Sequence, residues 1–401
     1  MWAAIMRLAT CGQPWQSRRM RVLGFMTGTS LDAVDMAVLE TDGETILGFG
    51  PCGERKLSDS VRKLLLSATE AARGWPRGDP EPAIFAEAAQ AVADEHFTAA
   101  EAFLEKNGLT WGEIDLIGMH GQTVLHERPQ EGRVGRTVQL GDAQRLSNQT
   151  GVPVAFDFRT ADVAAGGEGA PLAPIYHLAR ARASEMTPPL AVLNVGGVAN
   201  VTLWTGVGEL SAFDTGPGNG MIDLLVQERG AGRYDDKGNY ASVGLVDESI
   251  LRALLAHPYF DAEPPKSLDR YDFSLEPLAD LKLEDAAATL VAFTAEAVRL
   301  GFEKLKTSPK QVIVTGGGRH NPEIMKALRE RLSAEVLAAE DVDWRGDAIE
   351  AEAFAFLAAR TAAGLPISFP ATTGVPEPMT GGRIVAPAAQ SAKSSATEAG
   401  E

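Results

Sequence analysis

Between Val22 and Asp42, two apolar runs flank a short polar stretch made of residue types that bind phosphate. The polar stretch is Thr27-Gly28-Thr29-Ser30, and the carboxylates Asp32 and Asp35 follow it. Backbone N–H groups and hydroxyls can donate to phosphate oxygens, and a carboxylate can hold the magnesium ion that accompanies them. No Gly-Lys-Ser or Gly-Lys-Thr follows, so the stretch is not a Walker loop. An ordinary β-turn is the alternative.

A second group of chemically capable residues follows a predicted strand at Val152 to Phe156. Asp157-Phe158-Arg159 comes first, Asp162 follows, and a glycine-rich segment covers residues 164–172. Glycines allow a backbone to approach a ligand closely. Arg159 can grip an anion or orient a carboxylate, and Asp162 can act as a base. A surface loop with solvated charges is the alternative.

A polar turn, His120-Gly121-Gln122-Thr123, follows the predicted buried strand Ile114 to Met119. In open α/β sheets the carboxyl ends of strands face ligands, so this turn is a candidate substrate contact. A structural histidine bonded to the backbone is the alternative for His120.

The opening pattern of strand, glycine turn and strand recurs in the second half of the chain. Leu190 to Val195 and Val201 to Trp204 are predicted strands around the turn that begins Gly196-Gly197. An acidic glycine turn, Asp214 to Asn219, precedes a predicted helix and suits phosphates, and Thr315 to Gly318 offers a flat backbone for a purine. The recurrence predicts a duplicated domain, because its period is far longer than that of a solenoid.

Two charged positions stay open between a structural and a functional role. Lys266 is either a solvated surface lysine or a contact to phosphate and substrate. The helix that begins near Asp347 has an acidic start, which is favourable at a helix N-terminus for structural reasons alone. For Glu350 we therefore prefer the structural interpretation.

Strands and helices of ordinary length must position these residues. The periodicity and the turn residues predict a first hairpin over 22–42 and further strands. These strands are 45–56, 114–119, 137–140, 152–156, 190–195, 201–204, 211–213 and 311–314. The predicted helices are 61–72, 83–107, 142–148, 174–183, 221–228, 247–256, 283–306 and one that runs to 363.

Length and composition limit the function classes. A chain of 401 residues should form two domains, and a cleft between domains is a common place for a small-molecule site. The formal charge of -17 argues against nucleic acid or an anionic membrane as the main partner. Two cysteines cannot build a disulfide framework, which favours a reducing cytoplasm. No apolar run is long enough to span a membrane.

Taken together and in sequence order, these motifs resemble the anhydro-N-acetylmuramic acid kinases of the sugar kinase–Hsp70–actin superfamily. The resemblance covers about Arg21 to Ile384. It is carried by seven segments, namely Met26 to Asp32, His120 to Thr123, Asp157 to Asp162, Gly166 to Leu172, Asn194 to Asn200, Asp214 to Asn219 and Thr315 to Gly318. One departure is Ala33, which stands where the family usually has glycine.

The resemblance implies a fold, a reaction and a cofactor. The fold would be an α/β, two-lobed actin-like ATPase fold with duplicated mixed-sheet domains and a cleft between the lobes. The reaction would open the anhydro ring of 1,6-anhydro-N-acetylmuramic acid with water and move the γ-phosphate of ATP to O6. The product would be N-acetylmuramic acid 6-phosphate, within the recycling of cell-wall peptidoglycan. ATP and Mg²⁺ would be required, and a cytoplasmic homodimer is suggested.

The resemblance also implies roles for individual residues. Asp162 would be the catalytic base that takes a proton from the attacking water, and Asp32 would be a magnesium ligand through Mg-ATP. The implied sugar contacts are His120, Gln122, Arg159, Gly167 and Gly169. The implied ATP contacts are Gly28, Thr29, Ser30, Leu31, Asp32, Ala33, Val34, Asp35, Gly196, Gly197, Asp214, Gly216, Gly218, Asn219, Gly316, Gly317 and Gly318.

Two other functions stay open on the residues alone. One is a sugar kinase of the same superfamily that phosphorylates a free hydroxyl without ring opening. The other is a nucleotide-dependent binding protein of the actin and Hsp70 kind. A dinucleotide dehydrogenase is disfavoured, because no Gly-x-Gly-x-x-Gly follows the first strand.

We expect five segments in the domain organisation. Residues 1–19 are predicted to be a disordered extension unless Met20 is the natural start. The first lobe would comprise residues 20–187 together with a C-terminal helix at about 352–385. The second lobe would comprise residues 188–351, and residues 386–401 would form a disordered tail.

Overall fold

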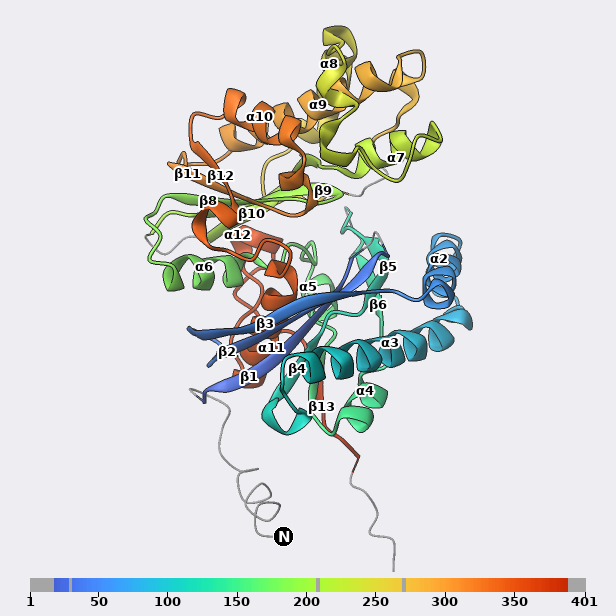
Figure 1. The fold of residues 1–401 in the computed structure, drawn as a ribbon, viewed down its shortest axis with the longest axis vertical. Coiled ribbons are helices and arrows are strands. Elements are labelled where there is room, and N and C mark those ends of the chain that lie inside the picture. The colour runs from blue at the N-terminus through green and yellow to red at the C-terminus, as the bar shows by residue number, and fades with distance from the viewer. Residues whose placement is uncertain (1–17, 29–30, 131, 207–209, 269–271, 389–401) are drawn as a thin grey trace, which may run out of the picture.

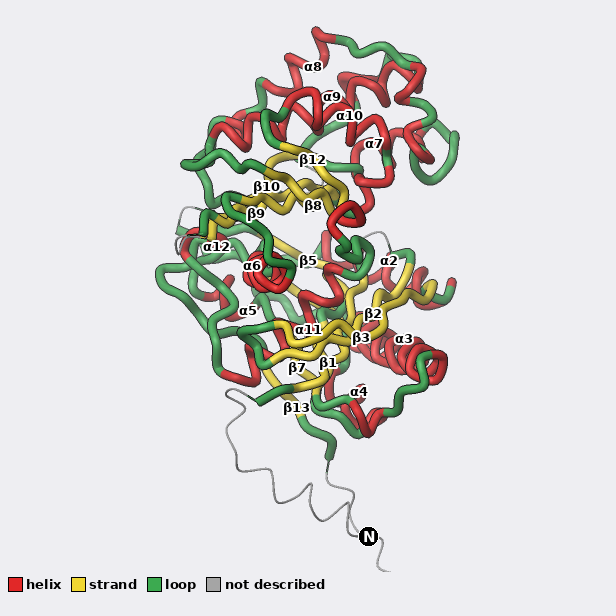
Figure 2. Tube along the Cα trace, turned by 60° about the vertical axis from the view of Figure 1, so that its left-hand side comes forward, coloured by secondary structure: helices red, strands yellow, loops and turns green. Residues whose placement is uncertain are grey.

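The chain forms two lobes, each built on its own β-sheet, in a computed structural model that describes residues 18–28, 31–130, 132–206, 210–268 and 272–388. Figure 1 shows the two sheets one above the other along the long axis of the molecule, and Figure 2 shows helices flanking both. The sheet near the N-terminus defines the first lobe, and the other sheet defines the second lobe.

The sheet of the first lobe has the strand order β13-β7-β4-β1-β2-β3. The strands β1 to β3 are antiparallel neighbours, and β4 and β7 run parallel to β1. The predicted hairpin is confirmed, with Met20 opposite Thr41 at its base. The bounds are β1 (Met20–Thr27), β2 (Ala33–Thr41), β3 (Ile46–Lys56), β4 (Leu116–Met119), β7 (Val154–Phe156) and β13 (Arg383–Val385).

The sheet of the second lobe repeats this plan in the order β10-β9-β8-β11-β12. Its first three strands are antiparallel neighbours, and β11 and β12 run parallel to β8. Both sheets therefore have three antiparallel strands followed by two parallel ones, which confirms the predicted duplication. The bounds are β8 (Leu190–Val195), β9 (Val198–Trp204), β10 (Leu210–Pro217), β11 (Gln311–Thr315) and β12 (Glu335–Ala338).

Helices cover the faces of both sheets, and α3 and α11 pack on the first one. α3 buries an apolar stripe that includes Ala88, Val92 and Phe103. α9 packs on β10 in the second lobe. The bounds are α2 (Asp59–Arg73), α3 (Ile84–Lys106), α4 (Ala143–Thr150), α5 (Thr160–Ala164), α6 (Pro174–Ala183), α7 (Gly220–Glu228), α8 (Glu248–Leu255), α9 (Leu283–Glu303), α10 (Pro322–Arg331), α11 (Ile349–Ala363) and α12 (Pro370–Thr373).

Two facing glycines allow α11 to lie directly on the strands of the first sheet. Gly24 of β1 is paired with Gly118 of β4 in the parallel ladder. A Cβ atom would lie 1.9 Å from the carbonyl oxygen of Ala351 if placed on Gly24, and 2.2 Å from that of Phe354 if placed on Gly118. Helix and strands thus touch backbone to backbone, and no side chain fits between them.

The chain passes from one lobe to the other at two neighbouring places within its described part. It leaves the first lobe after α6 and returns between β12 and α11. Side chains tie the two crossings together, because Arg180 donates to the carbonyl oxygen of Asp343 at 3.0 Å and the Trp344 indole donates to Ser184 Oγ at 3.1 Å. The buried cluster around α11 also contains side chains from both sheets, among them Val22 and Ile313.

Three parts of the sequence interpretation need correction. The turn at His120 to Thr123 is short, because Gln122 already begins the strand β5 (Gln122–Glu127), which pairs with β6 (Arg136–Leu140). The strand β10 continues through Pro217, where we expected a turn from Asp214. The helix α5 replaces part of the expected loop after Arg159.

The expected C-terminal helix at about 352–385 is wrong in its extent. α11 ends at Ala363, because Gly364 adopts a left-handed conformation with φ of 67° that stops the helix. The helix α12 and the strand β13 follow, and β13 extends the first sheet beside β7. The lobe boundaries at 187/188 and 351/352 stay predictions. The expected terminal disorder covers residues 1–19 and 386–401, of which residues 1–17 and 389–401 lie outside the described residues.

No stretch that could cross a bilayer as a helix is found among the described residues.

Candidate active site

The carboxylate of Asp162 is enclosed by the glycine-rich segment that follows it. Its side chain is 1% exposed. Oδ1 accepts the backbone N–H of Gly169 at 2.6 Å, and Oδ2 accepts the hydroxyl of Thr373 at 2.5 Å. A Cβ atom on Gly167 would lie 2.3 Å from Oδ1, so only glycine lets the backbone close over the carboxylate. The segment from residue 167 to residue 169 therefore covers the predicted base.

Arg159 and His120 form one unit beside Asp162. Arg159 donates Nε and Nη2 to His120 Nε2 at 3.2 and 3.1 Å, and Nη1 to the carbonyl oxygen of Gly169 at 2.8 Å. Because arginine can only donate, Nε2 of His120 is an acceptor and the neutral ring carries its proton on Nδ1. Burial, and then the charge of Arg159, hold the pKa of His120 well below its usual value. Burial also lowers the pKa of Arg159.

Gln122, two residues after His120, has a buried polar atom without a partner in the described structure. Its Nε2 donates to the carbonyl oxygen of Thr123 at 3.2 Å. Its Oε1 is buried and has no hydrogen-bond partner among the described residues. An unpaired buried acceptor is costly, and a donor group on a ligand would satisfy it. The predicted sugar contacts His120, Arg159, Gly167 and Gly169 are thus brought together around Asp162, and Gln122 follows His120 at the start of β5.

The predicted phosphate hairpin meets the second lobe at its tip. The Gly28 carbonyl accepts the N–H of Leu31 at 3.1 Å, and Leu31 has a φ of 54°, which is uncommon for a non-glycine residue. Thr29 and Ser30 lie outside the described residues. Asp32 forms an ion pair with Arg233, which follows α7. Ala33, Val34 and Asp35 belong to β2 and not to the turn.

Carboxylates of β2, of β3 and of the start of α11 influence one another next to this turn. Burial and, to a smaller extent, the neighbouring charges of Glu350 and Glu54 raise the pKa of Asp35 to about 7. Glu350 is partly exposed to solvent, yet desolvation by the surrounding protein raises the pKa of its carboxylate. The charge of Arg159 and the hydrogen bond from Asn194 act in the opposite direction. Asn194 donates to Glu350 Oε1 at 3.3 Å. The start of α11 therefore faces both the glycine turns of the second lobe and the strand β2, which the sequence interpretation of Glu350 missed.

The glycine turns of the second lobe pack on one another. The N–H groups of Gly218 and Asn219 donate to the carbonyl oxygens of Gly197 and Gly196 at 3.0 and 2.7 Å. Gly316 has a φ of 74°, and a Cβ atom on it would lie 2.2 Å from Asn194 Oδ1. The predicted ATP contacts Gly196, Gly197, Gly218, Asn219 and Gly316 to Gly318 are brought together. The amides of Gly218 and Asn219, however, are already used within the protein.

Asp214 and Gly216 lie on β10 with different neighbours. Gly216 is buried, and a Cβ atom on it would lie 2.6 Å from the side chain of Ala297 in α9. Asp214 Oδ2 accepts the N–H of Leu268 at 2.8 Å, and its carbonyl oxygen accepts the Tyr259 hydroxyl at 2.5 Å. Burial raises the pKa of Asp214 to about 7, although the Leu268 N–H lowers it. Asp214 thus anchors the loop that carries Lys266.

The raised pKa of Asp214 predicts a pH-dependent stability. Between about pH 4 and pH 7 the Asp214 carboxyl keeps its proton in the native state, whereas in the unfolded chain, where its pKa is lower, it has lost the proton. The contribution of Asp214 to the free energy of unfolding therefore falls as the pH rises through this range. Asp214→Asn removes the titration and should flatten that decline, by at most about 4 kcal/mol. Urea unfolding of both proteins across this pH range measures it, with the exposed Asp79→Asn as control. Equal slopes for wild type and Asp214→Asn would contradict the assignment.

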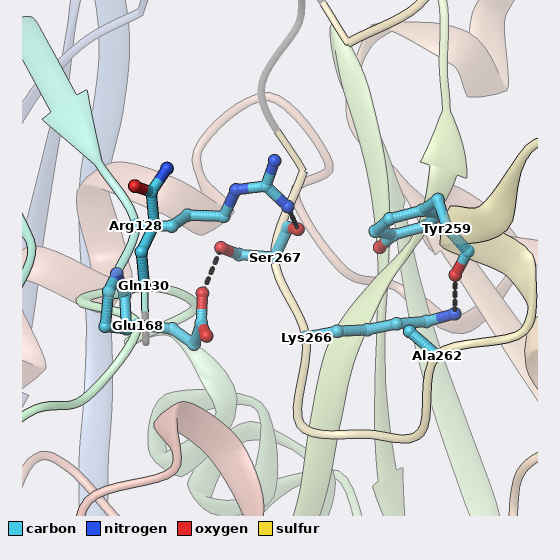
Figure 3. Close-up of a pocket in the computed structure, with 8 residues that line it drawn as sticks. Arg128, Gln130, Glu168, Tyr259, Ala262, Lys266 and Ser267 are labelled. Carbon is cyan, nitrogen blue, oxygen red and sulfur yellow. Dashed lines mark hydrogen bonds between the residues drawn. The ribbon is translucent and has the colours of Figure 1, made fainter. Parts of the chain in front are cut away.

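A cavity of about 230 Å³ lies between the two lobes (Figure 3). Arg128 and Glu168 line it from the first lobe, and Lys266 and Ser267 from the second. Arg128 donates to the Ser267 carbonyl oxygen at 2.6 Å, and the Ser267 hydroxyl donates to Glu168 at 2.5 Å. Sequence reasoning did not single out Arg128, because nothing in its own segment distinguishes it from a surface arginine.

A resident metal site is not apparent in the described part of the chain. No group of three or more histidine, cysteine or acidic side chains there could hold a metal ion. Oxygen donors are nevertheless present around Asp35, and Mg²⁺ commonly uses only one or two carboxylates together with phosphate oxygens and water.

Comparisons with known proteins give a consistent result. A family model described as anhydro-N-acetylmuramic acid kinase matches residues 20–387. The anhydro-N-acetylmuramic acid kinase of Phenylobacterium zucineum is 76% identical over 368 residues, which are 92% of this chain and 100% of the relative. That of Caulobacter vibrioides is 69% identical over 366 residues, which are 91% of this chain and 99% of the relative.

Solved structures match more weakly. Component A of (R)-2-hydroxyglutaryl-CoA dehydratase from Acidaminococcus fermentans has a TM-score of 0.44 and 14% identity, covering 86% of this chain and 99% of its own. A ROK family glucokinase from Streptomyces griseus, in complex with glucose and AMPPNP, has a TM-score of 0.40 and 12% identity, covering 84% of this chain and 99% of its own.

Proposed function

The chain belongs to the anhydro-N-acetylmuramic acid kinase family, and from this premise we propose which of its residues perform the reaction. It is an ATP-dependent kinase of the two-lobed sugar kinase–Hsp70–actin fold. It opens 1,6-anhydro-N-acetylmuramic acid with water and phosphorylates O6, giving N-acetylmuramic acid 6-phosphate in peptidoglycan recycling. This membership replaces the alternatives of a kinase without ring opening and of an actin-like binding protein.

Asp162 is the base in our proposal. Water attacks the anomeric carbon, its proton passes to the Asp162 carboxylate, and the bond from that carbon to O6 breaks. O6 then forms a bond to the γ-phosphorus as the bond from phosphorus to ADP breaks. The observation that supports this role is the placement of both Asp162 oxygens by Gly169 and Thr373. General-base assistance is typically worth about 10²–10⁴-fold in rate.

The enclosure of Asp162 sets a condition on this proposal. The carboxylate is 1% exposed, so the covering backbone at Gly167 must move before water and sugar can reach it. Arg159 and His120 then orient the sugar from the side, and the free Oε1 of Gln122 accepts from one of its donors. Positioning of this kind supplies much of the remaining rate enhancement.

The nucleotide lies, in our proposal, between the hairpin from Gly28 to Asp35 and the packed glycine turns of the second lobe. Gly196, Gly197, Gly218, Asn219 and Gly316 to Gly318 form one surface there, whereas Asp214 and Gly216 support it from β10. Mg²⁺ enters as part of the Mg-ATP substrate and neutralises phosphate charge. Asp32 can reach it only after its ion pair with Arg233 opens, and Asp35 offers a second carboxylate.

We further propose a cytoplasmic homodimer without nucleic-acid or membrane partners. The reaction consumes ATP, the chain has two cysteines, and its formal charge of -17 repels polyanions.

An isotope experiment tests the ring-opening reaction. Incubation with ATP, magnesium and the anhydro sugar in ¹⁸O-water should yield a phosphosugar with one heavy oxygen, located at the anomeric position. Mass spectrometry of the product and of its fragments locates the label. A control with N-acetylmuramic acid as acceptor corrects for exchange of the anomeric hydroxyl with water. A product without label at early times, or phosphorylation of the ordinary sugar alone, would contradict ring opening by water.

A further inference from the structure

The cavity between the lobes is lined by a buried cation, Lys266, that forms no ion pair with a described carboxylate. Lys266 is 8% exposed and lines the cavity. Its Nζ donates to the carbonyl oxygen of Tyr259 at 2.8 Å and lies 4.3 Å from the centre of the Tyr259 ring. Among the described residues, no carboxylate lies within ion-pair distance of this ammonium group. A buried ammonium normally has an anionic partner, because leaving water is costly for a charge.

The other wall of the cavity is already paired. Arg128 donates to Asp272 at 2.6 Å as well as to Ser267, and Glu168 accepts from the Ser267 hydroxyl. Figure 3 shows Lys266 extended toward the backbone of Tyr259, on the opposite side from Arg128 and Glu168. Burial and, to a smaller extent, the charge of Lys304 lower the pKa of Lys266 to about 8, against the effects of Glu263 and Asp261. An anion in the cavity would therefore meet, in Lys266, a cation that has no ion-pair partner in the described part of the chain.

The cavity adjoins the place where the sugar must lie. Glu168 stands between Gly167, which covers Asp162, and Gly169, whose N–H holds the Asp162 carboxylate. The volume of about 230 Å³ is below the roughly 300–1,000 Å³ of pockets that hold whole ligands, so the cavity suits a substituent of the sugar. The substituent that distinguishes muramic acid from glucosamine is a lactyl ether at C3, and it ends in a carboxylate.

We propose that this cavity is the subsite for the lactyl carboxylate of the substrate, and that Lys266 is the residue that selects for it. The inference rests on the proposed function, since it needs the sugar beside Asp162. Lys266 acts on binding and orientation only, and no bond to it forms or breaks.

A comparison of a charged and a neutral substrate tests this role. Lys266→Met should lower kcat/KM for 1,6-anhydro-N-acetylmuramic acid by roughly 10–100-fold, the usual loss for one hydrogen bond to a charged group. The methyl ester of the same sugar has nearly the same shape without the charge, and the variant should lose less than about threefold with it. Lys266→Arg should restore part of the preference for the acid. Lys266→Gln, which keeps a donor for Tyr259, repeats the test if the methionine variant is unstable.

Lys304→Met is the matched control. Lys304 lies close enough to influence Lys266, but it donates to Glu263 at 2.6 Å and does not line the cavity. It should leave both substrates unaffected, and ATP binding should be unchanged in all variants. Equal losses with acid and ester, or no loss with either, would overturn the inference. Failure of the proposed function would instead appear as wild-type protein inactive on both sugars.

Discussion

Asn in place of Asp162 should reduce phosphorylation of the anhydro sugar by roughly 10²–10⁴-fold while both substrates still bind. The amide can reproduce the local contacts, because its oxygen can accept from Gly169 and its NH₂ group can donate to the Thr373 hydroxyl. It cannot accept the proton of the attacking water. Single-turnover kinetics measure the chemical step, and calorimetric titration with ATP and with the sugar measures binding.

Glu350 provides the comparison that makes this result decisive. It is the exposed carboxylate near Arg159, whereas Asp162 is enclosed. If Asp162 is the base, Glu350→Gln should retain more of the chemical step than Asp162→Asn does. Near-normal turnover of Asp162→Asn would refute the assignment, and it would move the role to Glu350 if the glutamine variant were inactive.

Ala in place of Gly24 should destabilise the first lobe by about 3 kcal/mol or more, which is the upper range for overpacking. The added Cβ atom would lie 1.9 Å from the Ala351 carbonyl oxygen and 2.7 Å from the Ala355 nitrogen. Both are backbone atoms of α11, so no side chain can rotate away and the helix must shift. At roughly 2–4 °C per kcal/mol, the melting temperature should fall by at least about 6 °C.

Gly53→Ala is the matched control for this substitution. Gly53 also lies in a strand of the first sheet, β3, but a Cβ atom there would meet only the ring of Phe103 at 3.6 Å, an ordinary contact. Calorimetric melting of the three proteins should therefore separate Gly24→Ala from the other two. A melting temperature of Gly24→Ala within about 1 °C of wild type would show that α11 does not rest on the backbone of β1.

The main elements of both lobes could be predicted from local patterns. The hairpin of β1 and β2, the helices α2 and α3 and the strands β8 and β11 have clear apolar periodicity with glycine or proline at their ends. The duplication was also recognisable, because Gly28 and Gly196 each follow an apolar strand of similar type. The short strands β12 and β13 were not predicted, since each gains its stability from a neighbouring strand that is distant in sequence.

The candidate site was predictable in its motifs but not in its partners. Asp162, Arg159 and His120 stand in recognisable polar segments, and the structure places them together. Thr373, which holds Asp162, comes from a segment more than two hundred residues away that has no chemical signature of its own. Lys266 was ambiguous in the sequence, because only the fold reveals that its ammonium group is buried and forms no ion pair with a described carboxylate.

The paired crossings of the chain form a fixed connection between the two lobes. Arg180, Ser184 and Trp344 fasten the two connections at one side of the molecule, and α6 marks that side in Figure 1. The ion pair of Arg233 with Asp32 and the hydrogen bond from Arg128 to the Ser267 carbonyl oxygen join the lobes elsewhere. A pivot at the fastened side would part these contacts in a single movement. The nucleotide and the sugar would then enter and leave through the same movement of the lobes. A bound substrate that holds the lobes closed would therefore slow the dissociation of the other substrate.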